Sequence, residues 1–500
     1  MENVSLWIVL IEGCDSMNHY KLFPKFWCTF VICVFLSFGN AYANQIDPGK
    51  INEAYLQLAA SPQMENGLVS LTVIDARTGE LIFSENGKVG MAPASTLKNI
   101  TAATAFRVLG EDFRFKTKVL IKGRVDEEGV LHGDLIVQGS GDPSLGSERY
   151  EETKETLILE KWIQALKDRG IKTINGRILA NDLLFGGNQA PGGWPWADMG
   201  NYYGAGVSAL NWRENSFGVV FRPGSNPGDL AKIQSTSVDV SYLDIVNEVT
   251  TGRRGSGDNV YAYSAPYSNR VFFRGTHGAD LKKTISMSLP DPAYDLVYQL
   301  SRKLEEVGIN HKKPVATVYS LQSTGEGFVL EDDRDIEVLD VHESPVLSEL
   351  IYWFNRSSIN LYGESLLKAM AHKLGEETGT ADAASWMARY WSEALGIPVG
   401  ELRIADGSGL SPNNRITTHA MSRILLACRE EPWFEDFYES LPVNNGMKIK
   451  SGTIGGVLGY AGYHTSSLGI PLVFTILVSN YQGGAQAMRN QMFRLLDSLK

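Results

Sequence analysis

The pattern of apolar and polar positions divides the chain into stretches with helical periodicity and stretches with strand-like alternation. Apolar residues at helical spacing predict a short helix at 51–60, and alternating runs at 68–75 and 81–84 predict a β-hairpin. A helical run at 99–109 follows. From about residue 118 to 337, short alternating runs with many glycines predict a mostly β segment, whose helical patterns are confined to 155–168 and 293–307.

After residue 338 the pattern becomes helical again and ends in strands. Helices are predicted at 345–354, 360–374, 381–395 and 416–429, strands at 447–450, 459–463 and 472–478, and a last helix from residue 486. The two outer stretches therefore predict one α/β domain formed by residues 44–117 and 338–500. Residues 118–337 interrupt it as a large, mostly β insertion.

The first 43 residues have the composition of an export signal. An apolar run at 26–36 follows basic residues, and Ala41-Tyr42-Ala43 fits a cleavage site after Ala43. Residues 1–16 contain no Lys or Arg, so translation is expected to begin at Met17. Because the apolar run is too short for an ordinary spanning helix, we expect an exported chain without a stable membrane span.

Composition narrows the class of protein. A chain of 500 residues with 43% hydrophobic and 21% charged residues fits two or three globular domains. Lys and Arg (46) against Asp and Glu (57) give a net charge of −11 without a dense basic cluster, so nucleic acid is not an expected partner. Cys428 is the one cysteine after the leader, and we expect it to be a buried apolar residue rather than part of a disulfide.

Ser95 and Lys98 are the first candidates for chemistry. They are three residues apart beside a predicted helix, so their hydroxyl and amine can share one face. A serine hydroxyl needs a base to become a nucleophile, and a lysine can serve where burial or a second cation lowers its pKa. Taken alone, the pair also fits a helix cap beside a solvated lysine.

Two further motifs favour the catalytic interpretation of Ser95 and Lys98 over the helix cap. Ser358 and Asn360 precede an amphipathic helix, and Lys450 with Ser451 and Gly452 ends a predicted strand. Each motif has a plain alternative, since Ser358 could cap its helix and the lysine motif could be a strand end and turn. In this order, and in an exported chain, the three motifs together match the set used by serine acyl-transferases that bind penicillin.

On these motifs the sequence resembles the class C low-molecular-mass penicillin-binding proteins, the serine-lysine D-alanyl-D-alanine carboxypeptidases and endopeptidases of bacteria. The resemblance covers nearly the whole mature chain and includes the segments 133–135, 139–143, 202–210 and 406–411. It implies a serine β-lactamase and transpeptidase-like α/β fold, with helices around an antiparallel sheet and a long insertion. It also implies a periplasmic enzyme without a metal or organic cofactor.

The resemblance assigns roles to five catalytic residues. Ser95 would attack the carbonyl of the penultimate D-alanine, and Lys98, kept neutral by burial and by Lys450, would accept its proton. Ser358 would relay a proton to the leaving amine. Asn360 would bind the substrate amide and orient Lys98.

Substrate binding is expected along the last motif. The resemblance implies that Lys450, Ser451 and Thr453 hold the terminal carboxylate and that the N–H groups of Ser95 and Thr453 form an oxyanion hole. Gly452 would let the substrate approach the strand edge. Ser408, in the loop that matches the family, is a further expected binding residue.

The sequence departs from the family at one recognition position. Many members have an arginine directly after the 406–411 loop, whereas this chain has Pro412, with Arg415 nearby. Asp182 is the candidate partner for a diaminopimelate amine of the stem peptide, although it also fits a solvated carboxylate at a strand end. The aromatic residues at 194–196 and at Tyr202 and Tyr203 fit either a cleft lining or a core.

The expected partners are peptidoglycan peptides and β-lactams. A β-lactamase or esterase with the same nucleophile is an alternative, as is an inactive scaffold that binds the cell wall. The long insertion and the lack of an evident deacylating carboxylate count against a β-lactamase, and the intact motifs count against a scaffold. The balance between carboxypeptidase and endopeptidase activity, and homo-oligomerisation, are left open by the sequence.

Overall fold

The computed structural model describes residues 46–326 and 335–500. The predicted signal peptide at 1–43 and the proposed start at Met17 lie outside these ranges. Within them, no helix has both the length and the apolar character needed to cross a membrane.

A six-stranded antiparallel sheet joins the two ends of the described chain. Its strand order is β19-β20-β21-β22-β1-β2, and β1 pairs with β22 along its whole length, from Leu68 opposite Ser479 to Asp75 opposite Leu472. This long-range pairing confirms the predicted α/β fold with an antiparallel sheet. The strands are β1 (Leu68–Asp75), β2 (Leu81–Glu85), β19 (Val443–Asn444), β20 (Met447–Ile454), β21 (Val457–Thr465) and β22 (Pro471–Ser479).

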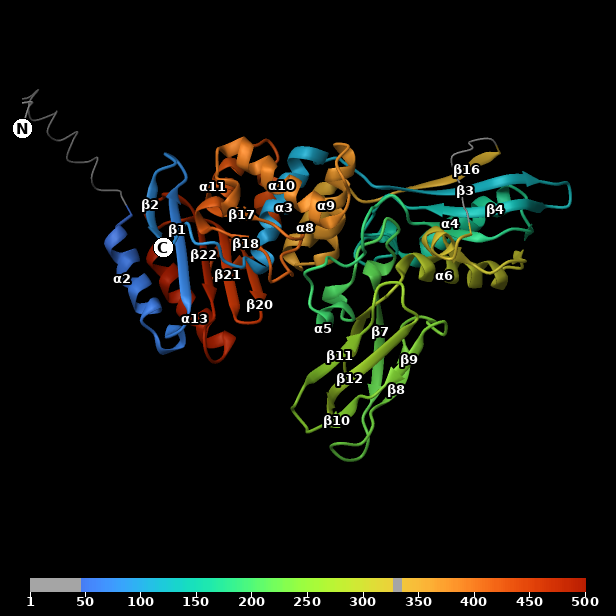
Figure 1. The fold of residues 1–500 in the computed structure, drawn as a ribbon, viewed down its shortest axis with the longest axis horizontal. Helices are drawn as coiled ribbons and strands as arrows, with labels where there is room; N and C mark the ends of the chain where they lie inside the picture. The colour runs from blue at the N-terminus through green and yellow to red at the C-terminus, as the bar shows by residue number, and fades with distance from the viewer. Residues whose placement is uncertain (1–45, 327–334) are drawn as a thin grey trace, which may run out of the picture. The chain divides into compact units, whose positions relative to one another are not determined.

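Helices cover both faces of this sheet (Figure 1). Along β21, side chains alternate between the faces, so Tyr460 packs on Phe493 of α13 while Tyr463 packs on Phe437 of α12 on the opposite side. The helices are α2 (Pro48–Ala59), α3 (Lys98–Leu109), α8 (Leu347–Arg356), α9 (Asn360–Lys373), α10 (Thr380–Leu395), α11 (Thr418–Cys428), α12 (Phe434–Ser440) and α13 (Ala485–Leu496). Cys428 is fully buried, as predicted.

The segment between the two halves of the α/β domain begins and ends in two neighbouring strands. Strand β3 (Lys116–Val125) pairs antiparallel with β16 (Ile336–Glu343), with Lys116 opposite Glu343. These two strands belong to a seven-stranded sheet packed on α4 (Glu155–Asp168) and α6 (Pro292–Glu306). Its other strands are β4 (Val130–Gln138), β5 (Thr173–Ile174), β6 (Ile178–Asn181), β14 (Asn310–His311) and β15 (Ala316–Thr317).

Two smaller sheets inside the segment share another core, which includes Phe217, Val260, Phe273 and Met287. One contains β7 (Ser216–Arg222), β8 (Lys232–Thr236) and β13 (Thr284–Ser288); the other contains β9 (Asp244–Asn247), β10 (Thr250–Gly252), β11 (Asp258–Tyr263) and β12 (Arg270–Gly278). The remaining α-helices of the segment are α5 (Trp196–Met199) and α7 (Val318–Ser323). The α/β domain also contains the short strands β17 (Leu402–Arg403) and β18 (Arg415–Ile416).

The predicted order of the longer elements agrees closely with the structure, and the helix predicted at 99–109 corresponds to α3. Ser95 lies in a 3₁₀ turn, η2 (Ala94–Leu97), and the α-helix begins only at Lys98. Ser95 is therefore not the first residue of the α-helix. The helix α12 was not predicted, because its seven residues are too few to establish a helical period.

Candidate active site

The turn η2 places Ser95 beside Lys98. One turn of chain separates the two residues, and Lys98 Nζ lies 3.0 Å from Ser95 Oγ. This turn packs on β20 at Gly452, where a Cβ atom would lie 2.6 Å from the carbonyl oxygen of Pro93 and 2.9 Å from the amide nitrogen of Ser95. The absence of a side chain at position 452 therefore lets the serine turn approach the strand.

Lys98 is fully buried, and two oxygen atoms accept its N–H groups. Its Nζ is 2.6 Å from Asn360 Oδ1 and 2.7 Å from the carbonyl oxygen of Ser408. Burial, with the charge of Lys450, lowers the pKa of Lys98 well below its usual value, although Asp406 and Glu364 act in the opposite direction. A neutral amine has two N–H groups and one lone pair, so these two acceptors leave the lone pair free to face the Ser95 hydroxyl.

Ser358 and Lys450 form a second pair. Lys450 Nζ donates to Ser358 Oγ at 3.0 Å and to the carbonyl oxygen of Ser451 at 2.9 Å. Burial lowers the pKa of Lys450 to about 7. Ser358 has a backbone φ of 56°, in the left-handed region that residues other than glycine rarely adopt. The structure thus brings two serine–lysine pairs together, and strained backbone at one of them is common at functional sites.

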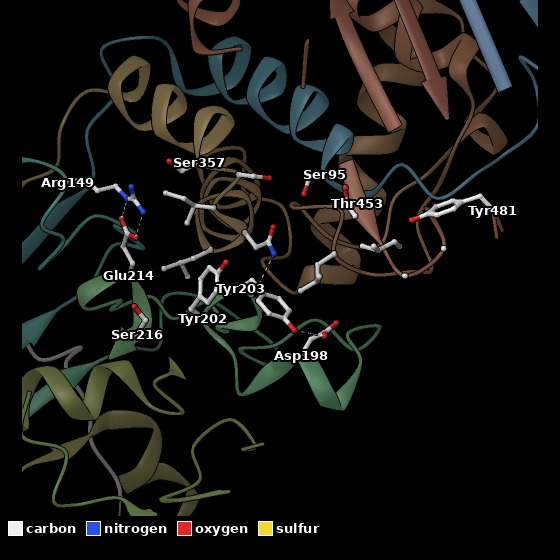
Figure 2. Close-up of a pocket in the computed structure, with 18 residues that line it drawn as sticks. Ser95, Arg149, Asp198, Tyr202, Tyr203, Glu214, Ser216, Ser357, Thr453 and Tyr481 are labelled. Atoms are coloured by element: carbon white, nitrogen blue, oxygen red, sulfur yellow. Dashed lines mark hydrogen bonds and ion pairs between the residues drawn. The ribbon is translucent and has the colours of Figure 1, made fainter. Parts of the chain in front are cut away.

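A cavity of about 620 Å³ contacts both serines (Figure 2). Ser95, Ser358, Asn360 and Thr453 line it from the α/β domain. Figure 2 shows Ser95 and Thr453 on one side and Arg149 with Glu214 on the other. The residues that line the cavity from the inserted segment are Arg149, Asp198, Tyr202, Tyr203, Glu214 and Ser216.

Glu214 reaches the cavity from an unusual turn. Arg213, Glu214 and Asn215 all have positive φ, at 54°, 52° and 50°. The carboxylate of Glu214 accepts hydrogen bonds from Arg149 Nε at 2.6 Å and from the hydroxyl of Tyr362 at 3.1 Å. Sequence reasoning missed this pair, since nothing in the local sequence marks three successive residues for the left-handed conformation.

Some predicted binding residues do not face the cavity. Ser408 is fully buried, and its carbonyl contacts Lys98 rather than the cavity. Along β20 the side chains of Ser451 and Thr453 alternate with that of Lys450. The hydroxyl of Thr453, although the residue lines the cavity, lies 3.4 Å from Arg489 Nη2 of α13.

Asp182 lies apart from these residues. It is buried, and its carboxylate accepts a hydrogen bond from the backbone amide of Tyr319 at 3.1 Å, while burial raises its pKa to about 6. It is not among the residues that line the cavity, so its position gives no support to recognition of a stem-peptide amine. Arg415 is also turned away, because its guanidinium donates to the carbonyl oxygens of Pro412 and Asn414.

Two buried carboxyl groups that the sequence analysis did not single out, those of Glu364 and Asp406, lie near Lys98. Glu364, one helical turn after Asn360, accepts hydrogen bonds from the amide of Gly407, and burial and the charge of Asp406 raise its pKa to about 8. The spacing of four residues on α9 is the signal that would have found Glu364. Within residues 46–326 and 335–500, no group of three or more His, Cys, Asp or Glu is placed to hold a metal ion.

The sequence is similar to those of known peptidases. Residues 52–499 match the D-Ala-D-Ala carboxypeptidase 3 (S13) family. A D-alanyl-D-alanine carboxypeptidase from Actinomadura sp. (strain R39) is 28% identical over 85% of this chain and 80% of the relative. The D-alanyl-D-alanine carboxypeptidase DacB from Haemophilus influenzae is 24% identical over 84% of this chain and 87% of its own length.

The fold is similar to that of solved structures. The crystal structure of penicillin binding protein 4 (dacB) from Haemophilus influenzae has a TM-score of 0.74 at 23% identity, covering 91% of this chain and 99% of that one. A second structure of the same protein, in complex with a β-lactam, has a TM-score of 0.69 at 22% identity and covers 90% and 98% of the two chains.

Proposed function

The chain belongs to the D-Ala-D-Ala carboxypeptidase 3 (S13) family, and from this premise we propose that Ser95 is the nucleophile with which it cleaves D-alanyl-D-alanine peptides. The protein is a serine D-alanyl-D-alanine carboxypeptidase that acts on peptidoglycan. The observation that carries the role of Ser95 is its 3.0 Å contact with Lys98 in the wall of the cavity. The balance between trimming of stem peptides and cleavage of cross-links depends on which of the two substrates fits the cavity.

Acylation follows from the first pair. Ser95 Oγ attacks the carbonyl carbon of the penultimate D-alanine, and its proton passes to the lone pair of Lys98. The developing oxyanion is stabilised by the N–H groups of Ser95 and Thr453, each worth a factor of about 10² to 10³ in rate. The close packing of η2 on Gly452 supports this role, because it holds the two amides on adjacent segments of chain.

Release of the terminal D-alanine follows from the second pair. Ser358 passes a proton to the leaving amine and is supplied by Lys450, which is 3.0 Å away. Protonated Lys450 binds the carboxylate of the leaving residue. Water then attacks the acyl carbon, and its proton passes through Ser358 to Lys450. Lys98 returns its proton to Ser95 Oγ as the ester bond breaks, which restores both pairs.

β-Lactams fit the same chemistry. Attack on the lactam amide breaks the ring, but the leaving amine stays tethered to the acyl group and does not depart. A β-lactamase would need a group that activates water against this ester. Asp198 and Glu214, the carboxylates in the lining, are already engaged by the Tyr203 hydroxyl at 3.2 Å and by Arg149, which favours a peptidase that penicillin inhibits.

The site of action that fits this substrate is the periplasm. Peptidoglycan lies outside the cytoplasmic membrane, so the enzyme must be exported to meet its substrate. The predicted signal at residues 1–43 supplies that route, with cleavage after Ala43.

Intact mass spectrometry with benzylpenicillin tests the function. The chain starting at Asn44 and its Ser95→Ala variant are each measured before and after exposure to the drug. We expect a stable penicilloyl adduct on the wild type alone, and release of D-alanine from a peptide ending in D-alanyl-D-alanine. An unmodified wild type with intact drug would favour a scaffold, and an unmodified wild type with hydrolysed drug would favour a β-lactamase.

A further inference from the structure

The inserted segment holds both hydrogen-bond acceptors of Lys98. Asn360 Oδ1 and the carbonyl oxygen of Ser408 are these acceptors. The side chain of Asn360 donates to the carbonyl of Tyr203, and Asp406, two residues before Ser408, accepts from Trp194. We propose that Trp194 is a positioning residue for proton transfer from Ser95 to Lys98, acting through the loop that carries Ser408. This inference rests on the proposed serine peptidase function and extends the catalytic apparatus into the insertion.

The first acceptor is oriented by the backbone of the insertion. Asn360 Nδ2 donates to the carbonyl oxygen of Tyr203 at 2.7 Å. A flipped amide would turn its oxygen toward that carbonyl and its N–H₂ group toward Lys98, losing both bonds. The carbonyl of Tyr203 therefore selects the amide orientation that presents Oδ1 to Lys98.

The second acceptor depends on a buried carboxylate. Asp406 is fully buried at the start of the loop that carries Ser408, and buried carboxyl oxygens need hydrogen-bond donors there. Its Oδ1 accepts from the amide of Gly409 at 2.8 Å and from Asn414 Nδ2 at 2.9 Å. These donors belong to the loop itself, so Asp406 acts as the centre around which the loop folds.

The remaining oxygen of Asp406 connects the loop to the insertion. Asp406 Oδ2 accepts from the amide of Ser411 at 2.6 Å and from the indole Nε1 of Trp194 at 2.9 Å. Trp194 is the donor that lies outside the loop in sequence, 212 residues away. Its neighbour Gly193 is packed so closely on the loop that a Cβ atom there would lie 2.4 Å from Ser411 Oγ.

Loss of the indole N–H would therefore act on Lys98 at a distance. Asp406 Oδ2 would retain one donor, the amide of Ser411. The loop would lose its hydrogen bond to Trp194 and keep the longer one from Ser411 Oγ to the carbonyl oxygen of Gly193, at 3.4 Å. The carbonyl of Ser408 would then no longer be held at its position 2.7 Å from Lys98. The substitution removes no direct contact with the substrate, because neither Trp194 nor Asp406 lines the cavity; Leu410 is the residue of this loop that does.

The test is Trp194→Phe, which keeps a buried ring and removes the N–H donor. Its matched control is Trp391→Phe, where a fully buried indole donates to Thr104 Oγ1 at 2.8 Å, on α10, away from the acceptors of Lys98. Acylation by benzylpenicillin is followed by mass spectrometry at several drug concentrations from pH 5 to 10. Thermal unfolding reports the loss of stability in both variants.

We expect both variants to lose similar stability. At saturating drug, Trp194→Phe alone should be acylated about 10- to 100-fold more slowly, while its noncovalent affinity for the drug stays unchanged. The acidic limb of its pH profile, which follows deprotonation of Lys98, should move, while that of Trp391→Phe should not. Where Trp194→Phe does not fold, 3-benzothienylalanine at position 194 replaces it, since this side chain keeps the ring size and lacks only the N–H.

Three outcomes would count against the proposal. Acylation of Trp194→Phe at the wild-type rate and with the wild-type pH profile would overturn it, and so would equal losses in Trp194→Phe and Trp391→Phe. A wild type that is not acylated at all would overturn the proposed function, and this inference with it.

Discussion

Lys450 Nζ lies 3.0 Å from Ser358 Oγ, so the second serine of the centre has a lysine of its own, as Ser95 has Lys98. Both lysines are buried, and burial lowers the pKa of each. The pairs differ in their surroundings. Asn360 Oδ1 and the carbonyl of Ser408 accept from Lys98, whereas Lys450 donates to Ser358 and to the carbonyl of Ser451 and is proposed to bind the substrate carboxylate.

The affinity for peptides that end in a carboxylate should fall as the pH rises through about 7. Burial lowers the pKa of Lys450 to about 7, so its charge is present below that pH and is lost above it. The measurement is KM from pH 6 to 9 for a peptide ending in D-alanyl-D-alanine and for the same peptide with a C-terminal amide. An identical pH dependence of KM for the two peptides would contradict the assignment of Lys450 to the carboxylate.

Ser358→Gly and Ser358→Ala should impair turnover alike but differ in stability. Both remove the hydroxyl that is proposed to pass a proton to the leaving amine. At a φ of 56°, alanine retains the left-handed strain and glycine relieves it, so Ser358→Gly should be more stable than Ser358→Ala by about 1 kcal/mol. Urea unfolding measures the difference, and equal midpoints for the two variants would show that position 358 carries no strain.

Gly452→Ala should lose acylation while keeping the fold. The added Cβ would meet two backbone atoms, the carbonyl oxygen of Pro93 at 2.6 Å and the amide nitrogen of Ser95 at 2.9 Å, and backbone cannot move aside as a flexible side chain does. Overpacking of this kind costs about 1 to 3 kcal/mol, and displacement of Ser95 from Lys98 should slow acylation by about 100-fold or more. Gly400→Ala is the matched control, since its Cβ would meet no atom within 4 Å. Equal acylation rates in the two variants would rule out the contact as a determinant of the site.

Asp291→Asn should make the stability of the protein less dependent on pH between about 4 and 7. Asp291 caps α6 by accepting from the amide of Tyr294 at 3.0 Å, and burial, with Asp182 and Asp295 nearby, raises its pKa to about 7. Because the folded state retains a proton that the unfolded chain loses above pH 3.8, this stabilisation is present below 3.8 and is lost as the pH rises to about 7. Asn keeps the cap without the charge, so the variant should gain up to about 4 kcal/mol over the wild type at pH 8.

Urea unfolding at pH 5 and pH 8 measures this effect. The control is Asp168→Asn, at an exposed carboxylate near the end of α4. If wild type and Asp291→Asn lose the same stability between the two pH values, then Asp291 is not the group that titrates.

The sequence by itself determined the order of the elements and the chemical identity of the centre. Ser95 and Lys98 are three residues apart, so local geometry alone brings hydroxyl and amine within reach. The bounds of α4 follow from its helical period, and β1 and β22 follow from their apolar content. Such features depend on neighbours along the chain, which a sequence displays directly.

Only the tertiary structure decided what surrounds that centre. Asn360 meets the carbonyl of Tyr203 across 157 residues, and Trp194 meets Asp406 across 212. The same packing turned Asp182 toward Tyr319 and brought Glu214 to the cavity. These contacts depend on how separate sheets and helices pack, and one sequence contains no local signal for a partner hundreds of residues away. The candidate serines and lysines were therefore evident from the sequence, whereas Trp194 and the carbonyl of Tyr203, which contact their neighbours, were not.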